Sequence, residues 1–352
     1  MMLDTKEFVK KLVDEGYSHI CAVPCSFAKY LINEVINNEK IEYIACASEA
    51  IACSVATGLK IARKNPIVIM QSSGLTNAGS NITSLLKPYG ITFPIITSWR
   101  TYKEGDSEIQ HKHLAANLPK LIEAYGYQYT ILDQNDIKKS IEQIGSCNST
   151  NTIAILKKDT FSKVELEDKH KLDLSKYPKR SEYLKILNKN YKNSNVLFIG
   201  TTGNTAREMY SFMNETNNFY MVGNMGGALS IGLGASKAGK DVIVLGGDAE
   251  FVMHMGGLTT AGRYKNVNLT YILFDNEQNK STGNQNSYQS HVDYISIAES
   301  CGFNVYENCV TNLNDFEYAL KNRENLYFIH VKCDIDEVTP RPPVDAIIKY
   351  KV

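Results

Sequence analysis

The residues best placed to do chemistry follow two apolar runs in the second half of the sequence. Residues 242–245 lead into Gly246-Gly247-Asp248, and residues 269–274 lead into Asp275-Asn276. Both runs have the composition of buried strands, so we expect Asp248 and Asn276 at the carboxyl edge of a parallel sheet, where open α/β sheets bind ligands. Carboxylate and amide oxygens suit Mg²⁺, whose shell is usually completed by water and phosphate oxygens. The pair predicts a metal-bound diphosphate; alternatively, Asp248 only caps a helix after a βα turn.

Two further predicted strands end in polar segments rich in glycine. Residues 196–199 are followed by GTTGNT at 200–205, and residues 219–222 by GNMGG at 223–227. Backbone N–H groups and hydroxyls at such strand-to-helix turns can receive a phosphate. Four strand ends therefore predict one anion-binding edge.

These features resemble the thiamine diphosphate (ThDP)-dependent decarboxylases, whose Gly-Asp-Gly motif and later asparagine match Gly247-Asp248-Ala249 and Asn276. Ala249 replaces the third glycine of that motif. The short family members have the two domains expected here and lack the middle domain of their larger relatives. The resemblance is carried by VPCSF at 23–27, ASEA at 47–50, SGLTNA at 73–78, QH at 110–111, TTGNTARE at 201–208 and GDAEFVMHMG at 247–256.

The elements that must position these residues form two alternating series. Short β-branched runs alternate with helical stretches, which predicts an α/β fold with mostly parallel sheets flanked by helices. The resemblance implies two ThDP-binding-fold domains, a pyrimidine-binding domain at 1–160 and a diphosphate-binding domain at 186–352, joined by a charge-dense linker at 161–185. The predicted strands are 18–23, 41–46, 66–70, 93–98, 127–132, 152–156, 196–199, 219–222, 242–245, 269–274 and 326–331.

Composition narrows the possible partners and location. The 352 residues carry 38 basic and 38 acidic side chains, and this balance argues against a nucleic-acid-binding surface. The apolar runs are far shorter than the roughly 20 residues of a membrane helix. The N-terminus has no basic and apolar signal pattern, which favours a cytoplasmic location. The eight cysteines form no Cys-x-x-Cys pair, so we interpret them as reduced core residues.

Glu49 is the residue whose interpretation changes most with the resemblance. From the residues alone, it begins a predicted helix at 50–62 and would simply complement the helix dipole. In the family, a buried glutamate at this position hydrogen-bonds N1′ of the cofactor's aminopyrimidine. It thereby promotes the tautomer whose 4′ nitrogen removes the thiazolium C2 proton. The cofactor then supplies the electron sink for loss of carbon dioxide.

The resemblance also assigns the rest of the site. It implies Mg²⁺ ligands at Asp248, Asn276 and the carbonyl of Gln278, and catalytic roles for His111 and Ser26 beside Glu49. Met225 matches the bulky residue that bends the cofactor, although an ordinary core methionine is the alternative. His111 and His113 are expected in a polar loop at 104–113. The predicted cofactor contacts are Thr201, Thr202, Gly203, Gly223, Met225, Gly247, Ala249 and Glu250, and the predicted substrate contacts are Asn77, Thr76 and His113.

The implied activity is ThDP- and Mg²⁺-dependent decarboxylation of an anionic 2-oxo acid, first of all phosphonopyruvate, which yields phosphonoacetaldehyde for phosphonate biosynthesis. The enzyme is expected to be a homodimer or larger homo-oligomer with sites between subunits. Sulfopyruvate, another 2-oxo acid, carboligation and a catalytically silent regulatory homologue are the alternatives. Arg100, Lys29 and Lys280 could meet the substrate's anionic head, or each could be a solvated cation.

Overall fold

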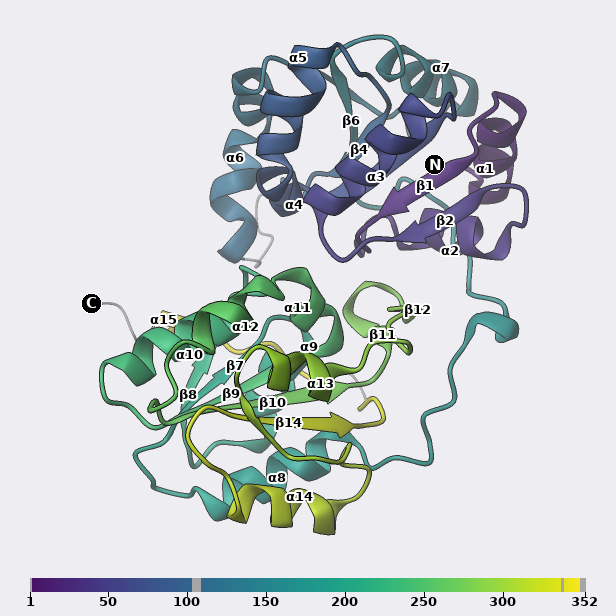
Figure 1. Cartoon of the computed structure of the whole chain (residues 1–352). Coiled ribbons are helices and arrows are strands. Elements are labelled where there is room, and N and C mark those ends of the chain that lie inside the picture. The colour runs from purple at the N-terminus through teal and green to yellow at the C-terminus, as the bar shows by residue number, and fades with distance from the viewer. Residues whose placement is uncertain (1, 103–108, 337–338, 349–352) are drawn as a thin grey trace. The chain divides into compact units, whose positions relative to one another are not determined.

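The computed structural model describes residues 2–102, 109–336 and 339–348 (Figure 1). The chain divides into two compact units. The first consists of Met1–Lys171 with Ser281–Asn286, and the second of Leu172–Lys280 with Ser287–Val352. Each unit contains one six-stranded sheet with parallel strand pairs. The predicted α/β fold with two mostly parallel sheets is therefore confirmed.

The sheet of the first unit has the strand order β2-β1-β3-β4-β6-β5. Its strands are β1 (His19–Ala22), β2 (Glu42–Ala45), β3 (Pro66–Gln71), β4 (Ile95–Ser98), β5 (Gln128–Ile131) and β6 (Thr152–Leu156). The accompanying helices are α1 (Thr5–Asp14), α2 (Lys29–Asn37), α3 (Glu49–Ile61), α4 (Ser72–Asn77), the π-helix Asn81–Leu86, α5 (Lys87–Tyr89), α6 (Ile109–Ala124) and α7 (Ile137–Cys147).

Both faces of this first sheet are buried, because successive side chains of a strand point to opposite faces. In β3, Ile67 and Ile69 join the core formed with α1, α2 and α7. Val68 and Met70 join the core formed with α3, α4 and α6. The continuous apolar character of the predicted strands follows from this double burial.

The second unit repeats the arrangement with the strand order β13-β14-β10-β9-β7-β8. The strands of the unit's sheet are β7 (Leu197–Gly200), β8 (Asn217–Tyr220), β9 (Val242–Gly247), β10 (Leu269–Asp275), β13 (Asn304–Val305) and β14 (Tyr327–Lys332). The short strand β11 (Gln278–Asn279) lies outside this sheet, and the short strand β12 (Gln285–Asn286) belongs to the first unit. The helices are α8 (Arg180–Asn190), α9 (Asn204–Phe212), α10 (Ala228–Lys237), α11 (Asp248–Met253), α12 (Gly256–Ala261), α13 (Tyr294–Ser300), α14 (Leu313–Lys321) and α15 (Val344–Ile348).

Each predicted strand is present, with small shifts at the ends; β8 lies two residues earlier than expected. The polar loop predicted at 104–113 is wrong where the structure describes it. His111 and His113 lie in α6, because His111 continues the buried stripe of Ala115, Leu118 and Ile122 at helical spacing. Residues 103–108 of that predicted loop lie outside the described residues.

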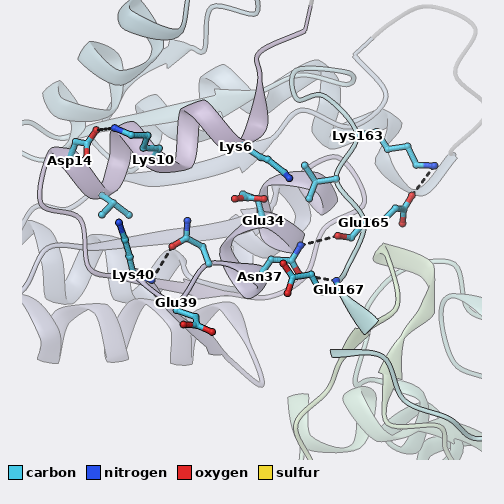
Figure 2. Close-up of a pocket in the computed structure, with 13 residues that line it drawn as sticks. Lys6, Lys10, Asp14, Glu34, Asn37, Glu39, Lys40, Lys163, Glu165 and Glu167 are labelled. Carbon is cyan, nitrogen blue, oxygen red and sulfur yellow. Dashed lines mark hydrogen bonds and ion pairs between the residues drawn. The ribbon is translucent and has the colours of Figure 1, made fainter. Parts of the chain in front are cut away.

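The segment predicted as a linker is partly structured, although the predicted domain boundaries themselves stay predictions. Residues 163–167 lie along α2, where the amide of Asn37 donates to the carbonyl of Glu165 at 2.9 Å and its oxygen accepts from the N–H of Glu167 at 3.0 Å. Figure 2 shows the groove of about 680 Å³ that α1, α2 and this segment enclose, lined by both lysines and carboxylates. Further along, α8 begins at Arg180. In the described ranges, no helix is long and apolar enough to cross a bilayer.

A buried ion pair joins α8 to α9. Arg180 Nε lies 2.5 Å from Glu208 Oε2, and its Nη2 donates to Oε1 at 2.9 Å. The two side chains are only 6% and 1% exposed. Since α9 begins at Asn204, within the polar segment at 200–205, this pair fixes the helix that supports a candidate phosphate site.

Arg180→Met should lower the free energy of unfolding by about 3–5 kcal/mol, because it leaves the Glu208 carboxylate buried without its partner. The double variant Arg180→Met/Glu208→Leu should recover most of that loss. Urea denaturation followed by circular dichroism measures both. Lys192→Met, which breaks an exposed pair with Glu215, is the control and should cost less than about 1 kcal/mol. Equal destabilisation of the single and double variants would contradict the expectation.

Candidate active site

Glu49 is held in one place by two helices of the first unit. It is the first residue of α3, which Ser48 caps by accepting the N–H of Ile51. Its side chain is buried, and the amide of Asn77 at the end of α4 donates to Oε2 at 3.0 Å. At Gly74, a Cβ atom would lie 2.2 Å from Glu49 Oε1, so a glycine is needed for the carboxylate to approach α4. The carboxylate is therefore positioned before any ligand binds.

Ser26 and Arg100 form a second cluster at the carboxyl edge of the same sheet. Ser26 follows β1 and Arg100 follows β4, and the Arg100 guanidinium donates to the Ser26 hydroxyl. The guanidinium carbon also lies 4.5 Å from the centre of the Phe27 ring. Arg100 is only 7% exposed, so it is a buried cation and not a solvated one.

The other predicted contacts of this unit differ in burial. His111 is buried on α6, whereas His113 is exposed and its carbonyl accepts from Asn117. Thr76 is exposed, and its hydroxyl donates to the carbonyl of Ser73 at 2.6 Å. Asn77 contacts Glu49, as described above. Their predicted roles toward substrate stay predictions.

Asp248 and Asn276 lie at the same edge of the sheet in the second unit. They follow the adjacent strands β9 and β10, in which Gly247 is paired with Phe274. Asp248 is 3% exposed and its carboxylate accepts the Ser287 hydroxyl at 2.5 Å, while Asn276 Oδ1 accepts the N–H of Gln278 at 3.3 Å. Burial, reinforced by the nearby Asp275 carboxylate, raises the pKa of Asp248 to about 7. A bound divalent cation would favour the ionised carboxylate instead.

The donor set at this edge fits Mg²⁺ with a phosphate ligand. The described residues contain no group of three His, Cys, Asp or Glu side chains placed to hold a metal ion. A cation beside Asp248 would therefore depend on amide, carbonyl, water and phosphate oxygens, which is the shell that Mg²⁺ prefers.

The segment after β7 offers a place for those phosphate oxygens. Thr201 is buried, and its hydroxyl makes no hydrogen bond of normal geometry within the described part of the chain, although it lies close enough to the Glu250 carboxylate to favour the ionised form of that group. Gly203 precedes the first turn of α9 with a φ of 84°, a left-handed conformation that favours glycine. A buried hydroxyl beside a helix N-terminus is what a diphosphate oxygen would satisfy. Thr202 and Gly203 are half-buried next to it.

Glu250 holds the loop that carries Met225 in place through hydrogen bonds. Met225 stands between Asn224 and Gly226, whose φ angles are 58° and 90°, and it is half-buried. The Glu250 carboxylate accepts the N–H of Ala228 and the hydroxyl of Tyr271, each at 3.2 Å. Burial raises the pKa of Glu250 to about 7. These contacts give Glu250 a structural role, and its contact with cofactor stays a prediction, as do those of Gly223, Gly247 and Ala249.

Sequence reasoning missed a charged cluster behind the candidate metal site. His330 Nε2 lies 2.9 Å and Lys332 Nζ lies 2.8 Å from Asp275 Oδ2, and Lys332 also pairs with Glu277. Burial works against ionisation of Asp275, but the bonds from His330 and Lys332 hold its pKa below the usual value. The cluster anchors the turn that presents Asn276. No local spacing could reveal it, because β14 meets β10 only in the sheet.

Comparison with known proteins identifies the family. The model of the N-terminal TPP binding domain of thiamine pyrophosphate enzymes matches residues 5–117, and that of the C-terminal TPP binding domain matches residues 199–331. Thiamine pyrophosphate is another name for ThDP. One match lies in the first unit and includes Glu49, and the other lies largely in the second unit and includes Asp248 and Asn276.

Three relatives show how far the similarity extends. A phosphonopyruvate decarboxylase from Streptomyces viridochromogenes is 28% identical over 340 residues, which are 91% of this chain and 85% of the relative. A sulfopyruvate decarboxylase from Methanosarcina acetivorans is 26% identical over 357 residues, covering 93% and 90%. A sulfopyruvate decarboxylase subunit beta from Methanothermobacter thermautotrophicus is 42% identical over 136 residues, 38% of this chain and 72% of the relative. With both TPP-binding domains and decarboxylases among its full-length relatives, the chain belongs to the thiamine pyrophosphate enzymes as a ThDP-dependent decarboxylase.

Proposed function

We propose that this protein is a Mg²⁺-dependent carboxy-lyase that converts 3-phosphonopyruvate to phosphonoacetaldehyde and carbon dioxide. The observation that carries the proposal is the joint presence of a buried, positioned Glu49 in one unit and the Asp248–Asn276 pair in the other. The similarity to a phosphonopyruvate decarboxylase over most of both chains supports the choice of substrate.

Each group of site residues has a role in the proposed reaction that follows from its chemistry. Asp248, Asn276 and the Gln278 carbonyl would hold Mg²⁺, and the N–H groups and hydroxyls of 201–203 would hold the diphosphate. Gly223 and Met225 would contact the pyrimidine and thiazolium parts. Bound ThDP supplies the electron sink for loss of carbon dioxide. Glu49 would hold a proton at the aminopyrimidine N1′, and the Asn77 amide keeps the carboxylate oriented toward it.

We also propose that two copies of the chain share each active site. The glutamate belongs to one compact unit of the chain and the metal pair to the other, so the two can be contributed by different copies. In one relative, a separate subunit called beta corresponds to only 38% of this chain, which supports the idea that the parts function as associating pieces.

Sulfopyruvate is the second candidate substrate. The full-length sulfopyruvate decarboxylase relative is nearly as similar as the phosphonopyruvate decarboxylase. A sulfonate head carries one negative charge where a phosphonate carries up to two, and both present three oxygens to hydrogen-bond donors. Carboligation would use the same residues but would need an aldehyde acceptor.

Addition of ThDP with Mg²⁺ should raise the melting temperature of the purified protein. A ligand that binds only the native state adds about 2.7 kcal/mol of stability at a hundredfold excess over its Kd. Differential scanning fluorimetry measures the shift. Asp248→Ala should lose most of it, whereas Asp345→Ala, at an exposed aspartate, should keep it. A native protein without a shift at millimolar ThDP and Mg²⁺ would refute the cofactor assignment.

Glu49→Gln should keep the ThDP-dependent shift but lower kcat by about 10²- to 10⁴-fold, because the amide cannot exchange a proton with the aminopyrimidine. Asn77→Ala should lower kcat by about tenfold, since it removes one hydrogen bond to the carboxylate. Glu123→Gln, at an exposed position of α6, is the matched control. An unchanged kcat in Glu49→Gln would show that the catalytic assignment is wrong.

The Glu49→Gln variant also tests whether two subunits share each active site. A mixture of Glu49→Gln and Asp248→Ala proteins should regain part of the native activity, because a hybrid dimer has one site with both residues intact. Subunit exchange is checked by native mass spectrometry. Exchange without recovery of activity would argue against shared sites.

Values of kcat/KM should fall in the order phosphonopyruvate, sulfopyruvate, pyruvate. A site built to hydrogen-bond an anionic head leaves buried donors unpaired when the head is missing, and such mismatches cost about 10⁴- to 10⁵-fold. Coupled spectrophotometric assays of aldehyde release measure the three constants. A preference for sulfopyruvate or pyruvate would overturn the substrate proposal and leave the cofactor assignment standing.

A further inference from the structure

We infer that Lys332 is a positioning residue that holds the turn after β10 in the shape required for Mg²⁺ and thereby determines selectivity for Mg²⁺ over Ca²⁺. This inference rests on the proposed function, in which Asn276 and the Gln278 carbonyl are Mg²⁺ ligands. The residues concerned all belong to the second unit. Because Lys332 is itself a cation, it acts on a bound metal through the residues that it holds.

Lys332 bridges the two carboxylates that flank Asn276 in the sequence. It is the last residue of β14 and is paired across the sheet with Asp275, the last residue of β10. Its Nζ lies 2.8 Å from Asp275 Oδ2 and also pairs with the Glu277 carboxylate. The side chains of Lys332, Asp275 and Glu277 are 16%, 2% and 19% exposed, so the bridge is largely shielded from water. One ammonium group therefore holds the residues immediately before and after Asn276.

The turn that this bridge holds has a backbone conformation that a glutamate does not favour. Glu277 has a φ of 51°, in the left-handed region that favours glycine. Two hydrogen bonds define the turn: the N–H of Glu277 donates to Asp275 Oδ1 at 3.1 Å, and the N–H of Gln278 donates to Asn276 Oδ1 at 3.3 Å. The pair with Lys332 offsets the cost of the left-handed backbone, and so keeps the Asn276 oxygen and the Gln278 carbonyl in one arrangement.

The turn is also connected to Asp248, the other proposed Mg²⁺ ligand. The carbonyl of Glu277 accepts the N–H of Ser287 at 2.8 Å. The hydroxyl of Ser287 donates to Asp248 Oδ2 at 2.5 Å. Displacement of Glu277 would therefore also move the donor that orients the Asp248 carboxylate. Through these contacts, a change at Lys332 reaches all three proposed ligands.

A turn that is fixed in this way favours the smaller cation. Mg²⁺ needs nearly octahedral oxygen ligands at about 2.1 Å, whereas Ca²⁺ accepts ligands at about 2.3–2.6 Å in a flexible geometry. Loosening the turn should hence weaken Mg²⁺ binding more than Ca²⁺ binding. Electrostatics alone predict the opposite effect of removing Lys332, because loss of a nearby positive charge strengthens the binding of any cation. The sign of the change therefore separates positioning from a simple effect of charge.

The test measures the Kd of Mg²⁺ and of Ca²⁺ by isothermal titration calorimetry of the purified protein with saturating ThDP. Lys332→Met should raise the Kd of Mg²⁺ by about 10- to 100-fold, the usual effect of removing a residue that orients a metal ligand. The Kd of Ca²⁺ should change by no more than about threefold, because Ca²⁺ tolerates a looser site. Lys332→Arg keeps a cation that can bridge both carboxylates and should recover most of the Mg²⁺ affinity. Lys192→Met, which breaks an exposed pair with Glu215, is the matched control and should change neither Kd.

Two substitutions of Glu277 test the conformation of the turn directly, and they decide the question even if Lys332→Met does not fold. Glu277→Gly and Glu277→Ala remove the same negative charge and the same pair with Lys332. Glycine adopts the left-handed φ of this position without strain, whereas alanine does not. Glu277→Ala should therefore bind Mg²⁺ about tenfold more weakly than Glu277→Gly.

Circular dichroism and the melting temperature without ligands show which variants keep the native fold. An unchanged or lower Kd of Mg²⁺ in a folded Lys332→Met protein would overturn the inference. Equal losses of Mg²⁺ and Ca²⁺ affinity in that variant, or equal Mg²⁺ affinity in Glu277→Gly and Glu277→Ala, would also overturn it. A native protein that binds neither cation in the presence of ThDP would instead refute the proposed function.

Discussion

Burial of charge is the constraint on which the active-site architecture depends. Glu49, Arg100 and Asp248 are all nearly inaccessible to solvent, and a charged group in such a position is stable only when other groups hydrogen-bond to it or pair with it. Asn77 hydrogen-bonds to Glu49, Ser26 to Arg100, and Ser287 to Asp248. These hydrogen bonds therefore also determine where the loops and helices that carry the partners must lie.

The same constraint explains the buried residues that contact the candidate metal and phosphate residues of the second unit. In the second unit, Asp275 lies beside Asp248, and two neighbouring carboxylates would repel each other without cations nearby. His330 and Lys332 supply those cations from β14. Glu250 similarly ties the Met225 loop to the sheet through Ala228 and Tyr271. In our proposal, this edge is ordered before a metal and a diphosphate bind, which lowers the free-energy cost of binding them.

Two parallel sheets give the protein two edges with different tasks. One edge carries Glu49, Ser26 and Arg100, which suit proton transfer and anion recognition. The other carries Asp248, Asn276 and Thr201, which suit a cation and phosphate. Since parallel strands all end on the same side of a sheet, each set converges without any residue being close to another in sequence. In our proposal, these two tasks are brought together by association of subunits.

The sequence by itself determined the strands, the fold class and the polar residues at the strand ends. Buried parallel strands need continuous apolar runs, and the residues that follow such runs must lie at the sheet edge, so Asp248 and Asn276 could be located from local pattern alone. The family motifs extended this to Glu49. Tertiary structure decided which distant side chains meet. Asn77 with Glu49, Arg100 with Ser26, and Lys332 with Asp275 depend on strand order and on helix placement, which local periodicity does not encode. For the same reason His111, expected in a loop, became part of α6: its neighbours in the core, and not its polar sequence context, determined that the helix includes it.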